Sequence, residues 1–139
     1  MKILKTLILM AALFMGACGT KAADPNVKVI TPQEFRTKLA NDSCAYLLDV
    51  RKPDEFADGH LKGAHQLNWL DTDSFKQGAK SLDKTKTIYL YCRSGRRSNE
   101  AARYLTTQGY NVVDMEGGIL AWEKNGYPIT TATEPQDND

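Results

Sequence analysis

The chain has 139 residues, which is enough for one domain and too short for two domains of ordinary size. Hydrophobic residues make up 42% and charged residues 25%, a balance typical of a globular protein rather than a disordered one. The formal net charge is +1, so no overall positive field indicates nucleic-acid binding, and an anion would be attracted only by a local site. A compact, polar domain of this size is expected to act as a monomer.

The first residues are typical of an export signal, which we assign to residues 1–17. Two lysines precede an apolar run at 6–15 that is too short to span a bilayer permanently. The run leads into Met-Gly-Ala-Cys ending at Cys18, which resembles a bacterial lipobox with Met in place of the more usual Leu. The resemblance implies lipidation of Cys18 and anchoring to a membrane, through the lipid alone, on the periplasmic side of the cell envelope. Ordinary cleavage next to Cys18, which would release a soluble periplasmic protein, is the alternative.

The rest of the chain divides into a tether, a domain and a tail. Residues 18–26 are small and polar, as in a tether that holds a domain off a membrane. Residues 130–139 are polar, acidic and without periodicity, which predicts a flexible tail. The folded domain is therefore expected at 27–129.

Strands and helices alternate along that domain. Strands are expected at 27–30, 45–50, 63–67, 87–91 and 111–114, the third being the weakest candidate. The first helix follows Thr31, where Thr31, Pro32 and Glu34 form the pattern of an N-cap, a first helical position and a capping box. Further helices are expected at 53–57, 73–80 and 118–124, and a longer one runs from Arg96 to a stop at Gly109.

The alternation indicates the fold class. The strands at 45–50 and 87–91 are almost continuously apolar, which is typical of strands covered on both faces. Buried strands that alternate with helices favour parallel pairing. The sequence therefore predicts an α/β fold, an open parallel sheet of about five strands with helices on both faces.

The segment after the strand at 87–91 carries the candidate chemistry. It reads Cys-Arg-Ser-Gly-Arg-Arg-Ser at 92–98 and joins a strand end to a helix start, where open α/β sheets bind ligands. The helix N-terminus supplies unpaired N–H groups, and Gly95 lets the backbone curl so that such groups point inward. Three arginines add positive charge. A thiol at Cys92 is expected to be exposed to its substrate and held as the nucleophilic thiolate.

The plain alternative is that Cys92 is a small buried hydrophobe beside a solvated face of arginines. That interpretation requires a charged, glycine-containing segment to follow the strand by accident. We therefore favour the activated thiol and take Cys92 as the candidate catalytic residue.

The cysteine loop and two further blocks resemble the rhodanese family over nearly the whole domain. The upstream block contains Leu-Asp-Val-Arg at 48–51, Glu-Phe at 55–56, Gly-His-Leu at 59–61 and Gly-Ala at 63–64. The downstream block contains Glu-Gly-Gly at 116–118, Trp122, Gly126 and Pro128. Three blocks in the same order make the resemblance specific. The sequence departs from the pattern at His65, where many members have Asn.

This resemblance implies sulfur transfer without a metal or organic cofactor. Cys92 would take sulfane sulfur from thiosulfate or a related small anion and hold it as a persulfide, which cyanide, a thiol or a protein acceptor then collects. Pairing of Arg97 with an acidic group beneath the loop is an equal alternative to substrate contact. The residues expected to bind the substrate are Arg93, Ser94, Gly95, Arg96, Arg97 and Ser98.

Two other functions stay open. The domain could be a sulfur carrier that docks a partner with little turnover, since an intact loop does not by itself require fast catalysis. The same fold also hosts phosphatases and arsenate reductases, whose loop is Cys-x5-Arg and fits a larger oxyanion. Here Arg97 falls one residue earlier and Ser98 takes the sixth position after Cys92, which disfavours an oxyanion enzyme.

Asp49 and Arg51 follow a buried strand at the same edge of the predicted sheet as the cysteine loop. They could support the site. A salt bridge between Arg51 and Glu55 is the simpler expectation, because ion pairs also occur near sites without taking part in catalysis. With only His60 and His65 in the chain, a histidine-based metal site has little support.

We interpret Cys44 as a structural residue. It starts one strand whereas Cys92 follows the end of another, about 16 Å away if the strands are parallel neighbours. A disulfide needs Cα atoms within about 7 Å. We therefore expect no bridge between the two residues, and a buried thiol at Cys44.

Overall fold

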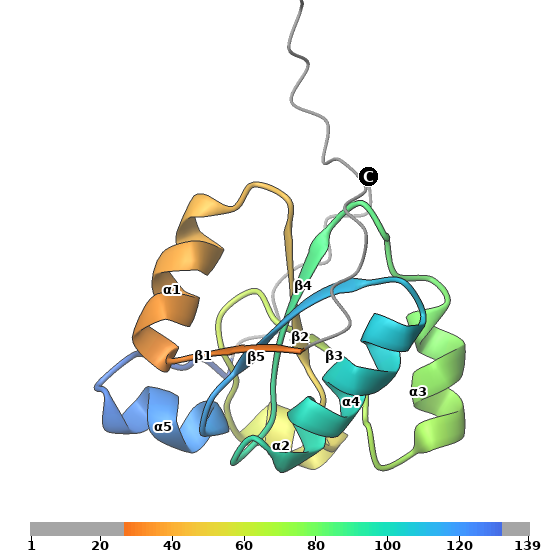
Figure 1. Ribbon diagram of the computed structural model, residues 1–139. Helices are drawn as coiled ribbons and strands as arrows, with labels where there is room; N and C mark the ends of the chain where they lie inside the picture. Colours follow the sequence, from red (N-terminus) through yellow and green to blue (C-terminus); the bar gives the residue numbers. More distant parts are fainter. Residues whose placement is uncertain (1–26, 132–139) are drawn as a thin grey trace, which may run out of the picture.

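Five parallel strands form one sheet in the computed structural model, which describes residues 27–131 (Figure 1). Their order across the sheet is β1-β5-β4-β2-β3, so β4 is the central strand. The strands are β1 (Lys28–Ile30), β2 (Ala45–Asp49), β3 (His65–Gln66), β4 (Thr87–Tyr91) and β5 (Asn111–Met115). The helices are α1 (Pro32–Asn41), α2 (Pro53–Asp58), α3 (Thr72–Ala79), α4 (Arg96–Thr107) and α5 (Gly118–Lys124).

The helices cover both faces of the sheet. α1 and α5 lie on one side and α3 and α4 on the other, while the short α2 follows the end of β2 (Figure 1). Each side has its own apolar cluster. Phe75 of α3 and Leu105 of α4 belong to one cluster, and Phe35 of α1 and Trp122 of α5 belong to the other. The predicted α/β fold, with a parallel sheet between two helical layers, is confirmed.

The predicted elements agree with the structure to within one residue at almost every end, and the third strand is the exception. β3 has only two residues, whereas the apolar pattern predicts a strand at 63–67. The N–H of Ala64 donates to the carbonyl of Leu61 in a turn, so the pairing with β2 begins only at His65. The N–H of Leu67 still donates to the carbonyl of Asp49 at 3.0 Å, just beyond the strand.

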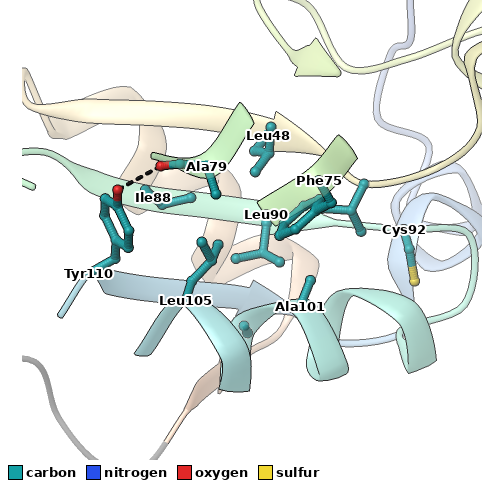
Figure 2. Packing of buried hydrophobic residues seen from close by; sticks show 11 residues of the cluster. Leu48, Phe75, Ala79, Ile88, Leu90, Cys92, Ala101, Leu105 and Tyr110 are labelled. Carbon is teal, nitrogen blue, oxygen red and sulfur yellow. Dashed lines mark hydrogen bonds between the residues drawn. The ribbon is translucent and has the colours of Figure 1, made fainter. Parts of the chain in front are cut away.

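Alternation along β4 determines where Cys92 points. Ile88 and Leu90 pack in the cluster under α3 and α4, whereas Tyr89 and Tyr91 pack in the cluster under α1 and α5. Cys92 continues the first series and lies at the end of that cluster, beside the start of α4 (Figure 2). The thiol is therefore anchored in a packed layer.

The first turn of α5 is bonded to the loop that follows β4. The N–H of Ile119 donates to the carbonyl of Cys92 at 2.8 Å, and the N–H of Leu120 donates to the carbonyl of Arg93 at 3.2 Å. Gly118, which directly precedes Ile119, has φ +62°. A Cβ at this position would overlap the same two carbonyl groups, so the close approach requires glycine.

Several sequence-based assignments lie outside the described residues: the export signal at 1–17, the lipidation at Cys18, the tether up to residue 26 and most of the tail. No helix within 27–131 combines the length and the apolar character needed to cross a membrane. Thr130, expected to begin the tail, exchanges two backbone hydrogen bonds of 2.9 and 2.8 Å with His60. The ordered chain therefore extends through Thr130.

We expect Gly118→Ala to lower the free energy of unfolding by about 3 kcal/mol or more, because its Cβ meets backbone and its φ disfavours a side chain. Gly126 is a matched control, since its φ is also positive, +76°, but a Cβ there meets nothing within 4 Å. Gly126→Ala should cost only about 1 kcal/mol. Denaturant titration of both variants measures the difference, and equal losses would show that contact with the loop is not the cause.

Candidate active site

The loop between β4 and α4 wraps its own backbone around the sulfur of Cys92. Gly95 has φ +106° and is the N-cap of α4. Its N–H donates to the Sγ of Cys92 at 3.0 Å. The chain thus places a backbone donor from a helix N-terminus against a sulfur atom, which is an arrangement that favours negative charge on that sulfur.

The side chain of Cys92 is less accessible than its sequence predicts. Only 1% of the residue is exposed, so the expectation of an exposed thiol is wrong. Its side chain belongs to the apolar cluster under α3 and α4, and the loop backbone curls back over the sulfur. Arg93 and Ser94, the next two residues, are exposed and form the outer surface of the loop.

The three loop arginines occupy different environments. Arg93 is exposed. The side chain of Arg96 is 89% exposed, with Glu100 at 3.7 Å as a loose partner on the same helix. Arg97 makes two hydrogen bonds to Glu55 of α2, at 2.6 and 2.9 Å. Arg93 and Arg96 are therefore available to an incoming anion, whereas Arg97 is engaged in joining α4 to α2.

The Arg97 pair shifts the pKa of both of its members. Hydrogen bonding from Arg97 lowers the pKa of the Glu55 carboxyl to about 2. The same hydrogen bond raises the pKa of the Arg97 guanidinium, with smaller contributions from the charges of Glu55, Cys92 and Asp49. The charge of Arg97 therefore also acts on Cys92, although its hydrogen bonds go to Glu55.

Ser98 lies behind the loop rather than at its surface. It is fully buried in the first turn of α4, and its hydroxyl donates to the carbonyl of Gly95 at 3.2 Å. The N–H of Asn99 donates to the same carbonyl at 3.1 Å. Ser98 thus holds the backbone of Gly95, the residue whose N–H contacts the sulfur.

Asp49 and Arg51 form a buried pair beside the loop. The guanidinium of Arg51 donates to both carboxylate oxygens of Asp49, the shortest contact being 2.6 Å, and also to the carbonyl of Gly59. The expected salt bridge between Arg51 and Glu55 is wrong. Glu55 faces Arg97 instead, and Arg51 turns back onto the strand end that precedes it.

Tyr91, next to Cys92 in the chain, secures the opposite face of the strand end. Its hydroxyl accepts a hydrogen bond from the N–H of Leu61 at 3.0 Å. Burial, followed by the charge of Asp49, raises the pKa of this phenol well above its usual range, so it stays neutral. The end of β4 is therefore fixed on both faces.

Three residues near the loop have roles that the sequence did not indicate. Trp69 donates from its indole N–H to Glu100 at 3.0 Å and so approaches the same carboxylate as Arg96. Asp114 is 2% exposed in β5, and burial raises its pKa to about 6. Glu55 is expected from the sequence to pair with Arg51, and its pairing with Arg97 is not indicated. Because partners 42 residues apart in sequence meet only in the fold, no local pattern identifies them.

Cys44 is half-buried and disulfide-bonded, so the expectation of a buried thiol there is wrong. Cys44 precedes β2 at its amino end, away from the carboxyl edge that carries Cys92. Cys92 itself is a free cysteine, which confirms that the two are not bridged. Within residues 27–131, no group of three or more His, Cys, Asp or Glu side chains gathers as metal ligands do.

Glu55→Gln is expected to lower the free energy of unfolding by about 1 kcal/mol at neutral pH, since side chains that keep 18% and 23% exposure are partly screened. The pKa of Glu55 falls from 4.5 to about 2 on folding, so its stabilisation is complete above pH 4.5 and is lost as pH falls toward 2. Thermal melts across this range test the prediction, with Glu123→Gln on α5 as the control. A difference from wild type that does not shrink in acid would contradict the pairing.

The comparisons with known proteins agree with this geometry. Residues 31–125 match the family model of the rhodanese-like domain. The chain is 35% identical over 102 residues to YtwF of Bacillus subtilis, which covers 73% of this chain and 96% of that protein. It is 36% identical over 104 residues to a protein of Allochromatium vinosum named sulfurtransferase, covering 74% of this chain and 94% of the relative.

A solved structure shows the same fold. The rhodanese-related protein of Thermoplasma volcanium superimposes with a TM-score of 0.68 at 28% identity, over 76% of this chain and 99% of that one. The family model spans more than half of the chain, and the relatives are matched over nearly their full length. The chain therefore belongs to the rhodanese-like domain family, and its relatives include a sulfurtransferase.

Proposed function

We propose that this protein is a sulfurtransferase that carries sulfane sulfur as a persulfide on Cys92. The observation that carries the proposal is the hydrogen bond from the N–H of Gly95 to the Cys92 sulfur, made by the N-cap residue of a helix. A donor in this position stabilises a sulfur atom that bears negative charge, both as thiolate and as persulfide. Membership of a family that includes a sulfurtransferase gives independent support.

The reaction is a double displacement in which one sulfur atom moves. The Cys92 thiolate attacks the outer sulfur of thiosulfate, the sulfur–sulfur bond of the donor breaks, and sulfite leaves with the bonding electron pair. An acceptor nucleophile then attacks the outer sulfur of the persulfide, and Cys92 departs as the thiolate. Cyanide becomes thiocyanate, and a thiol becomes a persulfide. The steps balance without a separate oxidant or cofactor.

The charges around the loop suit a small anionic donor. Arg93 and Arg96 are exposed at the mouth of the loop and attract an anion as it approaches. Arg97 is held by Glu55, so it contributes a fixed positive charge and does not move to contact the substrate. A physiological acceptor would be a thiol, free or on a protein, and the domain is proposed to work as a monomer.

Two alternatives use the same loop differently. A sulfur carrier would load Cys92 at the same rate but release sulfur only to a docked partner. An oxyanion enzyme would place an arginine six residues after the cysteine, where this chain has the buried Ser98. Arg97 pairs with Glu55, and Ser98 contacts the backbone. The loop therefore has fewer side-chain donors for the several oxygens of a tetrahedral oxyanion, whereas a terminal sulfur needs fewer.

Mass spectrometry of the purified protein before and after thiosulfate tests the proposal. We expect a gain of about 32 Da, one sulfur atom, on the peptide that contains Cys92, and its loss with release of thiocyanate when cyanide is added. Cys92→Ser, which keeps the size but not the thiol, should show neither change. Loading without release to cyanide would favour the carrier. A reactive Cys92 that gains no sulfur would contradict sulfur transfer from thiosulfate.

We also propose that the protein is a lipoprotein anchored through Cys18 on the periplasmic side of the cell envelope. Cys18→Ser should move the protein from the membrane fraction to the soluble periplasmic fraction, because acyl chains alone hold it. A lipidated Cys18 has a thioether sulfur and can form no disulfide. Intact mass of the native protein tests this modification directly, because the acyl chains add to the mass of the mature chain. A wild-type protein without added lipid mass would favour the soluble periplasmic alternative.

A further inference from the structure

A buried carboxyl lies beneath the cysteine loop and has no part in the chemistry described above. Asp114 of β5 is 2% exposed, and its Oδ1 has no hydrogen-bond partner among the described residues. Its Oδ2 accepts only a long hydrogen bond, 3.5 Å, from the amide of Asn99. A buried carboxylate oxygen without a partner is costly, so its presence calls for an explanation.

The register of the sheet places Asp114 on the same face as Cys92. Asp114 pairs with Leu90 of β4, and Leu90 and Cys92 both belong to the cluster under α3 and α4. Cys92 is two residues farther along, about 7 Å. Asp114 therefore faces the first turn of α4, where the amide of Asn99 donates to its Oδ2 and the hydroxyl of Ser98 interacts with the carboxyl.

Ser98 connects this carboxyl to the sulfur. Its hydroxyl donates to the carbonyl of Gly95 at 3.2 Å, and the N–H of Gly95 donates to the Cys92 sulfur at 3.0 Å. A hydroxyl has only one proton to donate. An ionised Asp114 competes with the Gly95 carbonyl for it, whereas a neutral Asp114 can donate its own proton to Ser98 and leave the contact with Gly95 intact.

We propose that Asp114 is a positioning residue that sets the reactivity of Cys92 through Ser98 and the backbone of Gly95. In its neutral form it supports the loop geometry that favours the thiolate. In its ionised form it withdraws that support and adds a like charge beneath the sulfur. The inference deepens the proposed function and rests on it only for Cys92 being the reacting thiol.

Burial and hydrogen bonding, rather than neighbouring charges, determine the pKa of Asp114. Burial raises the pKa of Asp114 to about 6, while its interactions with Ser98, Asn99 and the backbone of Met115 act in the opposite direction. The paired residues Leu90 and Val29 on the neighbouring strands do not titrate.

The charged groups in the loop above are Cys92, the exposed Arg93 and Arg96, and Arg97 held by Glu55. Asp114 and Cys92 lie on the same face of the sheet, so a negative charge on one opposes a negative charge on the other.

Alkylation of Cys92 by iodoacetamide between about pH 5 and about pH 9 tests the proposal without any sulfur donor. Asp114→Asn keeps the size and the hydrogen-bonding capacity but cannot ionise. We expect its alkylation to be about tenfold faster than wild type above about pH 7, and the two rates to converge near about pH 5. Glu123→Gln, which removes an exposed carboxylate on α5, should follow wild type.

The connection through Ser98 is tested in a second background. In Ser98→Ala, the further change Asp114→Asn should alter the rate by less than about threefold. Thermal melts establish that each variant is folded, and Asp114→Ser is the substitute if Asn is not tolerated. An undiminished effect of Asp114→Asn in the Ser98→Ala background overturns the connection, and a pH profile identical to wild type overturns the proposal.

The readout separates this inference from the proposed function. Alkylation depends on the thiolate and on access to it, whereas persulfide formation depends also on the donor. A clear effect of Asp114→Asn on alkylation, together with no persulfide after thiosulfate, would count against sulfur transfer and leave the positioning role standing.

Discussion

Two hydrogen bonds from the first turn of α5 fix the orientation on which the site depends. They bind the carbonyls of Cys92 and Arg93, and no peptide bond of the described chain is cis. In a trans peptide the N–H points opposite to the carbonyl, so the N–H groups that follow these carbonyls point away from α5 and into the loop. The site is therefore lined by donors because another helix has taken up its acceptors, and Gly118 is the residue that lets that helix come close enough.

Side-chain contacts then hold the loop from several directions. Arg97 joins α4 to α2 through Glu55, and Arg51 joins Asp49, at the end of β2, to the carbonyl of Gly59. Ser98 secures the carbonyl of Gly95 from behind. These contacts involve α4, α2 and the segment after β2, so the donors around the sulfur are already oriented before a substrate arrives, and reorganisation during the reaction is reduced.

The sequence predicts well what local patterns determine. The Thr31 cap, with its hydroxyl accepting from the N–H of Glu34, and the apolar strand at 87–91 depend on neighbouring residues, and both appear where expected. The position of Cys92 at a strand end follows from the same patterns. The choice of Arg97 rather than Arg51 as the partner of Glu55 depends on how α2 meets α4, which no local pattern encodes. The burial of Cys92 was not predicted for a different reason: strand alternation continues one residue past β4, where the sequence indicated an exposed loop.

That burial has a consequence for the order of events. Sγ of Cys92 lies in a residue that is 1% exposed, so only a slender group reaches it. A sulfur bonded to it stands about 2 Å farther out, because the side toward the sheet is filled by the packed layer. Under the proposed function, the reacting sulfur therefore lies at two different depths, as a nucleophile in the empty form and as an electrophile in the loaded form. A bulky thiol that cannot touch the empty cysteine can collect the outer sulfur, and the fold would act as a size filter that tells donor from acceptor without changing its shape.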